Sequence, residues 1–358
     1  MLRVIRFSYL LILLSLFSNI FFAQAQTNVT RFDASQNNDY GVVYSLPRTQ
    51  LLVEAKIEKE TYDPGPLADY AYKYLTINAS NRRAVHYRLK SIKVLSKGVK
   101  DDKNQFIVRF DKKTVAPFVN LTDQGIIYSI NGDKQNDAPT PQAQSENNEL
   151  VTPPSLPQEY NLAGSQSKQA EIAAGYLFHV RESTMNIVTG DVESMPKDGQ
   201  SMKLVLGKLK SEEMGTLRLF CGDTIRETIT YKTEVEPEEN IQDKVIFRFS
   251  PLLGAVAAND LGGAPVYFSM SVVERAPEMT EKEMRKHEKS LDGVVYNLPG
   301  SAKIIVKYEG KTYFDAKLPI TQLGMQQSLT RKMFNDRGDT APKVYFDVNT
   351  GAISEIKQ

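Results

Sequence analysis

The sequence predicts an α+β protein that is mostly β, with two or more sandwich-like β-sheet subdomains and a helical hairpin packed on a sheet. The segment GVVYSLP at residues 41–47 returns as GVVYNLP at residues 293–299, and apolar and polar residues alternate after each copy, which is typical of a strand with one buried face. Between residues 167 and 222, apolar residues instead recur at helical spacing.

The chain begins with the features of a secretory signal peptide. In residues 1–25, Arg3 and Arg6 precede an apolar run that ends in Ala-Gln-Ala, a small-x-small cleavage pattern. The alternative is a membrane anchor, for which the run is short. We expect a mature chain that starts at Gln26 with a flexible lead over residues 26–40 and has no transmembrane segment. It would be exported to the periplasm, the outer membrane or the cell surface.

Charge and cysteine content narrow the function classes. The chain has 44 Lys and Arg residues against 43 Asp and Glu residues, so no net charge attracts it to nucleic acid or to an anionic membrane. Its one cysteine, Cys221, cannot form an internal disulfide, so the fold must depend on apolar burial. The sequence does not determine the oligomeric state.

Residues 41–132 predict an N-terminal β-rich domain with one short helix. Strands are expected at residues 84–95, 105–111 and 125–130, separated by turns with Gly or charged residues. The helix follows the turn at residues 62–66, and its apolar positions are Leu67, Tyr70, Ala71, Tyr74 and Leu75. We expect these residues to pack on the sheet; the alternative is that the tyrosines form a sugar-stacking platform.

Residues 133–166 predict a flexible linker. Their composition changes to Asn, Gln, Pro, Ser and Glu, with few aromatic or β-branched residues. Such a segment cannot bury enough apolar surface to offset the loss of chain entropy on folding. The linker therefore divides the protein.

Residues 167–222 predict an antiparallel helical hairpin. The first helix, over residues 167–188, ends near Gly190, and the second begins after Asp198 as N-cap. Its expected buried positions are Ala173, Leu177, Val180, Thr184 and Ile187 or Val188 in the first helix, and Met202, Val205, Leu206 and Leu209 in the second. The adjacent Glu212 and Glu213 lie on different faces, so we expect solvated or salt-bridged carboxylates and not a catalytic pair.

Residues 223–358 predict a C-terminal β-rich domain that contains the second GVVYxLP unit. Strands are expected at residues 224–233, 244–250 and 266–273, and a charged helix at residues 280–289. Residues 244–256 resemble residues 343–353, and each segment has a strand followed by a Gly turn, which indicates a repeated β-hairpin.

The repeated unit supplies the candidate structural or docking motif. Leu-Pro is expected at a bend or a sheet edge, because proline cannot donate a ladder hydrogen bond. We expect the two copies to occupy equivalent places in two related subdomains, with both leucines buried; the alternative is a pair of exposed docking segments. The candidate residues are Tyr44, Leu46, Pro47, Tyr296, Leu298 and Pro299.

The sequence indicates no catalytic, cofactor-binding or metal-binding residues. Its three histidines, His86, His179 and His287, show no metal-ligand spacing, and no nucleophile elbow or phosphate-binding loop occurs. Cys221 follows an apolar pair, so a small buried side chain is favoured over a nucleophile.

Three segments together resemble a known family: residues 41–46, the turn and helix at residues 62–75, and GTLRLFCG at residues 215–222. The family comprises exported proteins of Bacteroidetes-type bacteria and is known only as a domain of unknown function, family 4831. The resemblance implies an envelope protein and no activity. We therefore expect a non-enzymatic cell-envelope protein that binds a partner protein or glycan, or helps assemble an outer-membrane complex. The alternative is an envelope hydrolase acting on glycans or peptides with carboxylates brought together by the fold.

Overall fold

A computed structural model describes residues 28–31, 41–109, 119–132, 153–192, 198–291, 293–330, 333 and 342–357. The predicted signal peptide, most of the lead and the first part of the predicted linker lie outside these residues. The strands are β1 (Asn28–Arg31), β2 (Gly41–Asp63), β3 (Ala84–Arg109), β4 (Val119–Leu121), β5 (Ile127–Ile130), β6 (Asp223–Val235), β7 (Asn240–Ser250), β8 (Gly254–Val256), β9 (Ala264–Glu274), β10 (Gly293–Tyr308), β11 (Lys311–Thr330), β12 (Lys343–Phe346) and β13 (Ile353–Lys357). The helices are η1 (Ala68–Tyr70), α2 (Ala71–Leu75), α3 (Gln158–Leu162), α4 (Gln166–Thr189), α5 (Gly199–Cys221) and α6 (Glu281–Ser290).

Two long antiparallel hairpins, β2–β3 and β10–β11, form the centre of the molecule, and each begins with a GVVYxLP unit. Pairing jumps from Ser45–Gln105 to Pro47–Lys100 in the first hairpin and from Leu298–Met325 to Gly300–Ile320 in the second. In both hairpins, the next paired residue is two positions further along the first strand but five positions away on the second strand. Extra residues therefore bulge from β3 and β11 at equivalent places.

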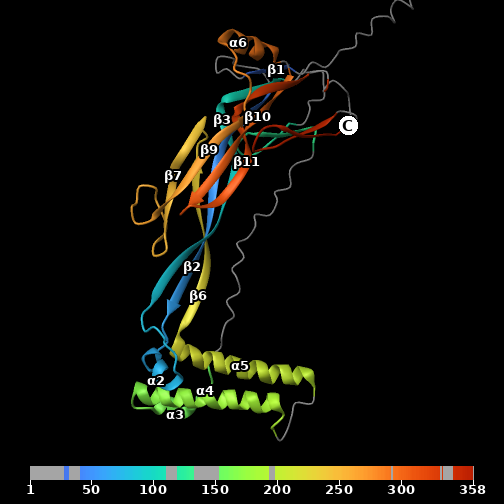
Figure 1. The fold of residues 1–358 in the computed structure, drawn as a ribbon. Coiled ribbons are helices and arrows are strands. Elements are labelled where there is room, and N and C mark those ends of the chain that lie inside the picture. Colours follow the sequence, from blue (N-terminus) through green and yellow to red (C-terminus); the bar gives the residue numbers. More distant parts are fainter. Residues whose placement is uncertain are drawn as a thin grey trace, which may run out of the picture.

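Three antiparallel sheets are built on these hairpins (Figure 1). Their strand orders are β1-β3-β2-β6, β11-β10-β9-β7-β8 and β13-β12-β5-β4. Because β6 pairs with β2 and β12 pairs with β5, two of the three sheets contain strands from both sides of the predicted linker. The observed architecture confirms the predicted mostly-β α+β class.

The first two sheets pack on each other through the larger apolar core. Alternate residues of β2, from Leu51 to Ile57, meet Phe247, Phe268 and Ile304 of the second sheet. A second core joins both motif units to the short third sheet, through Tyr44 and Leu46 on one side and Ile127 and Val344 on the other. Apolar burial on this scale is what a chain without disulfides requires.

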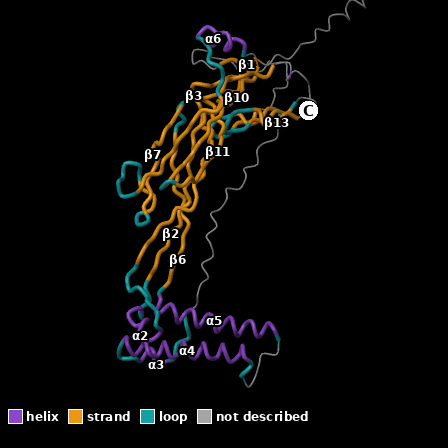
Figure 2. Tube along the Cα trace, in the orientation of Figure 1, coloured by secondary structure: helices purple, strands orange, loops and turns teal. Residues whose placement is uncertain are grey.

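Beyond the sandwich, β2, β3 and β6 continue as a three-stranded stalk (Figure 2). Ion pairs cross between its strands, including Lys59–Glu227 at 3.1 Å and Arg226–Glu60 at 3.0 Å. Such exposed pairs contribute at most about 1 kcal/mol each, and like charges opposite one another would weaken the pairing. Strand β2 alone, with 23 residues, spans roughly 75 Å.

Helices α4 and α5 form the predicted antiparallel hairpin, called here the helical arm. The side chain of Asp198 accepts hydrogen bonds from Gln200 N and Ser201 N at 2.9 Å each, and Gly190 ends α4 in the left-handed conformation. Both features confirm the predicted ends. Helix α6 also begins as predicted, with a reciprocal capping box between Thr280 and Glu283.

The position of the helical arm differs from the prediction. Its buried residues Ala170, Ala173 and Phe220 pack against Leu67 and Ala71 of the short helical segment, so the arm lies across the end of the stalk and does not cover a sheet. The helix at residues 67–75 was expected on the sheet and instead packs on the arm. The reason is that the stalk is a narrow ribbon, whereas η1 and α2 offer a compact apolar surface next to Gly222, where the chain enters β6.

Other strand boundaries differ from the prediction, because pairing with a distant strand overrides local turn signals in the sequence. The strands expected at residues 84–95 and 105–111 belong to one strand, β3, and the charged segment near Asp101 is its bulge. Gly98, which we expected in a turn, lies within β3 against the β12–β13 turn. A Cβ there would lie 2.3 Å from Val348 O, so the close approach requires glycine.

Candidate binding surfaces

The two motif units contact each other. The Tyr44 hydroxyl accepts a hydrogen bond from Val295 N at 2.9 Å and donates one to Val295 O at 3.2 Å, both buried. Strand β9 pairs with β10 only from Ser301 onward, so these backbone groups of Val295 face an edge of β10 with which no described strand pairs. The Tyr44 hydroxyl of the first unit therefore provides the hydrogen-bond partner for both of these backbone groups of the second unit.

Asn297, at the position of Ser45 in the first unit, makes the return contact. Its side-chain nitrogen Nδ2 donates to Pro47 O at 3.0 Å and to Thr350 O at 2.9 Å, and its backbone N donates to Gly351 O at 3.0 Å. The variable polar position of the motif thus joins the two units to the third sheet.

Leu-Pro lies at a strand edge, as predicted. On either side of Pro47, Ser45 N donates to Gly125 O at 2.9 Å and Thr49 N donates to Thr321 Oγ1 at 2.8 Å, while β6 joins β2 only from Leu51 onward. Proline at this outward-facing position removes no ladder hydrogen bond.

The candidate motif residues have different environments in the two copies. Tyr44 and Leu46 are buried, whereas Leu298 is 38 % exposed, so the expectation that both leucines are buried is wrong for Leu298. Tyr296 and Pro299 are half-buried, and the Tyr296 hydroxyl donates to Gln327 Oε1 at 3.0 Å. Equal sequence does not give equal burial here, because the third sheet covers Leu46 and leaves Leu298 outside its core.

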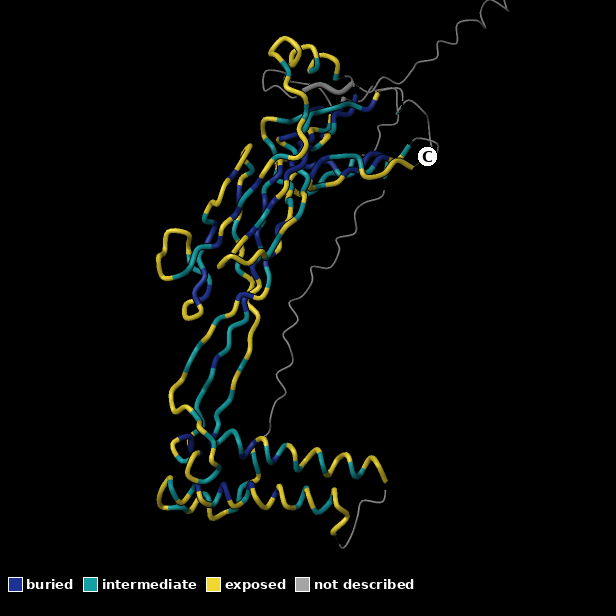
Figure 3. Tube along the Cα trace, in the orientation of Figure 1, coloured by how far each residue is buried: buried dark blue, intermediate teal, exposed yellow. Residues whose placement is uncertain are grey.

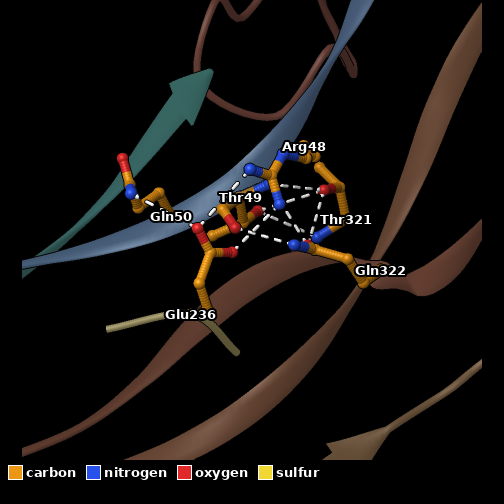
Figure 4. A network of polar contacts seen from close by, with 6 residues as sticks. All are labelled: Arg48, Thr49, Gln50, Glu236, Thr321 and Gln322. Atoms are coloured by element: carbon orange, nitrogen blue, oxygen red, sulfur yellow. Dashed lines mark hydrogen bonds and ion pairs between the residues drawn. The ribbon is translucent and has the colours of Figure 1, made fainter. Parts of the chain in front are cut away.

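A polar network lies beside the contact between the two motif units, called here the junction (Figure 4). The backbone and hydroxyl of Thr49 exchange hydrogen bonds with Thr321, and Gln322 Nε2 donates to Thr49 O at 2.7 Å. Arg48 binds both carboxylate oxygens of Glu236, at 3.0 and 3.5 Å. The β11 bulge is therefore bonded to the first motif unit.

The junction borders a cavity of about 310 Å³, called here the junction cavity. Pro47 and Asn297 of the two motif units lie on its wall, together with the bulges of β3 and β11 and one face of α6. Its lining includes Met279, Met284, His287 and Met325. None of these four was singled out as a binding residue from the sequence.

Toward the end away from the stalk, α4 and α5 are coloured mostly as exposed or intermediate (Figure 3), and several of the exposed residues of the helical arm are apolar. Met185, Val188 and Leu204 are 61 %, 68 % and 74 % exposed, and Phe178, Val205 and Met214 are also exposed. Val205 was expected to be buried, and of the alternatives Ile187 and Val188 it is Ile187 that is half-buried. A hairpin of two helices has one interface only, so apolar residues on its other faces stay in solvent. The consecutive Leu204, Val205 and Leu206 were the available signal, because three successive helical residues cannot all face one partner.

Glu212 holds the segment before α3 on the helical arm. Ser155 donates to it from N at 2.6 Å and from Oγ at 2.9 Å, Tyr176 Oη donates at 3.2 Å, and Lys208 Nζ lies at 2.7 Å. Desolvation raises the pKa of this buried carboxyl, but the four donors together outweigh it and lower the pKa to about 2. Glu213 pairs with Arg181 at 2.7 Å, so both glutamates are salt-bridged, as predicted.

The described residues contain no group of three His, Cys, Asp or Glu side chains placed to hold a metal ion. Cys221 is half-buried, and burial raises the pKa of its thiol, which disfavours the nucleophilic thiolate. In the junction cavity, Asp101 accepts hydrogen bonds from Lys103 N and Asn104 Nδ2 within its own bulge.

Within the described ranges, no helix is both long enough and apolar enough to cross a bilayer. Among known proteins, the family described as domain of unknown function (DUF4831) matches residues 40–354. No curated protein and no solved structure matches the chain.

Proposed function

The chain belongs to the DUF4831 family, and we propose that it is a non-enzymatic, exported cell-envelope protein that binds a partner protein through the helical arm. In this role it helps to assemble a complex at the outer membrane of a Bacteroidetes-type bacterium. The signal-peptide pattern of residues 1–25 supports export.

The exposed apolar end of the helical arm carries this proposal. Met185 and Val188 of α4 and Leu204 and Val205 of α5 leave large side chains in solvent on an element held apart from the sandwich by the stalk. Contiguous exposed apolar surface marks interaction sites in soluble proteins. Burying one such side chain in a partner would contribute about 1.5 to 3 kcal/mol.

The chemistry of this surface favours a protein over a glycan. Sugars are bound by aromatic faces combined with polar groups, whereas Met185, Val188, Leu204 and Val205 are aliphatic or thioether side chains. Phe178 is the aromatic member of the exposed apolar residues named on the arm. The nearby Tyr176 is hydrogen-bonded to Glu212. Apolar helical faces commonly dock against a partner groove or helix. The hydrolase alternative needs two facing carboxylates. Asp101 and Glu288 both line the junction cavity, but Asp101 accepts hydrogen bonds from Lys103 N and Asn104 Nδ2 within its own bulge.

Site-specific photo-crosslinking in the native envelope tests the proposal. A photoreactive residue at position 185 should give one discrete, protease-sensitive product, and Leu204→Glu should abolish it while leaving the thermal midpoint within about 1 °C, since an exposed site contributes little to stability. Leu261, 82 % exposed on the loop before β9, provides the matched control. Leu261→Glu should leave the product unchanged.

Two results would overturn the proposal. One is a crosslinked product that Leu204→Glu and the wild type form in equal amount. The other is a crosslinked product that resists protease and contains carbohydrate.

A further inference from the structure

The junction cavity gathers soft ligands that the proposed function does not use. Three methionines, Met279, Met284 and Met325, and one histidine, His287, line this space of about 310 Å³. Helix α6, which lines the cavity, lies at the end of the molecule opposite the helical arm (Figure 1).

The main chain brings these residues together from two elements. Met284 and His287 are three residues apart on α6 and therefore share a helical face, and Met279 lies directly before the N-cap Thr280. Met325 comes from β11, on another wall. Ala276 N donates to Leu323 O at 2.8 Å, so the segment leading to α6 is fixed to the β11 bulge.

His287 is oriented as metal-binding histidines usually are. Its Nε2 lies 2.8 Å from Gln326 O. A carbonyl oxygen can only accept a hydrogen bond, so Nε2 carries the proton and donates. In the neutral ring, Nδ1 then holds the free lone pair, and within the described residues no hydrogen bond engages Nδ1. A backbone carbonyl that fixes the tautomer in this way is the common second-shell partner of a histidine ligand.

We propose that Met279, Met284, Met325 and His287 form a binding site for a soft monovalent metal cation, Cu(I) or Ag(I). Thioether sulfur is a soft ligand that favours Cu(I), and imidazole also binds copper. Zinc prefers thiolate, imidazole and carboxylate, and calcium and magnesium prefer oxygen. The cavity lining also includes the carboxylates Asp101 and Glu288, of which Asp101 is hydrogen-bonded within its own bulge, so the three thioethers are the ligands that distinguish a soft cation from these hard ones. Methionine has three rotatable side-chain bonds, which allows sulfur atoms on facing walls to converge on one ion.

The test is metal titration of the full chain. Under anaerobic conditions, a chromogenic Cu(I) chelator should lose one equivalent of Cu(I) to the protein. Ag(I), which undergoes no redox chemistry here, should shift the methyl resonances of these three methionines in spectra of ¹³C-methyl-labelled protein. Met284→Leu and Met325→Leu should each weaken binding at least about tenfold, since even changes behind the ligands commonly cost 10- to 100-fold.

Matched controls separate a site from non-specific thioether binding. Leucine has nearly the volume of methionine, so these variants should keep the fold. Met185→Leu, on the exposed end of the helical arm, should leave metal affinity unchanged. Equal affinity of Met284→Leu and Met185→Leu, or the absence of Ag(I)-induced shifts at Met284 and Met325, would overturn the proposal. Shifts produced by apolar peptides and not by Ag(I) would also overturn it, since they would identify the cavity as a peptide site.

Discussion

Removal of the Tyr44 hydroxyl should destabilise the whole sandwich, because this group, together with the Asn297 side chain, joins the two motif units. Tyr44→Phe keeps the ring, which stacks on Phe106 at 5.7 Å between centroids, and removes both hydrogen bonds to Val295. Two buried backbone groups then lack a partner. Each costs about 1 to 3 kcal/mol, so the expected loss in free energy of unfolding is about 2 to 6 kcal/mol.

Tyr296→Phe is the matched control, because Tyr296 is the equivalent residue of the second unit. It is half-buried and loses only a hydrogen bond to the Gln327 side chain at 3.0 Å, so the expected loss is below about 1 kcal/mol. Chemical denaturation of both variants measures the difference. If Tyr44→Phe costs no more than Tyr296→Phe, Tyr44 does not have the joining role described here.

Three further predictions follow from burial, charge and sequence pattern. Leu46→Ala should lower the free energy of unfolding by about 2 to 5 kcal/mol, the usual cost at a buried site, whereas Leu298→Ala should cost under about 1 kcal/mol; equal losses in urea unfolding would contradict the burial difference. Because the pKa of Glu212 is lowered to about 2, its contribution to stability is complete above about pH 4.5 and is lost as pH falls through 2, on the order of 3 kcal/mol in all. Glu212→Gln should remove that pH dependence in thermal unfolding of the arm, and an unchanged acid profile would exclude the role assigned to Glu212. Export predicts a mature N-terminus at Gln26, which mass spectrometry of the envelope fraction checks; an intact residue 1–25 segment in membranes would refute it.

Features fixed by near neighbours in the sequence were predictable. Asp198, Gly190 and Thr280 mark helix ends because each acts within one turn of its own helix. The edge position of Leu-Pro was also predictable, since the missing amide of Pro47 is a property of the residue itself.

Features that depend on distant partners were not predictable. The difference in burial between Leu46 and Leu298 arises from the third sheet, whose core includes Leu46 and not Leu298. The junction cavity likewise combines Met284 and Met325, whose elements meet only in the folded chain. Local charge at Asp101 indicated a turn, but the β2–β3 ladder extends past it and leaves a bulge.

The stalk gives the molecule a mechanical property. Strands β2, β3 and β6 run from the sandwich to the helical arm, and α5 passes into β6 through Gly222 alone. Ladder hydrogen bonds lie perpendicular to antiparallel strands. A pull on the arm along the stalk therefore loads many of these bonds in shear at once and does not unzip them one after another. The stalk therefore resists a pulling force applied between the sandwich at one end and the helical arm at the other.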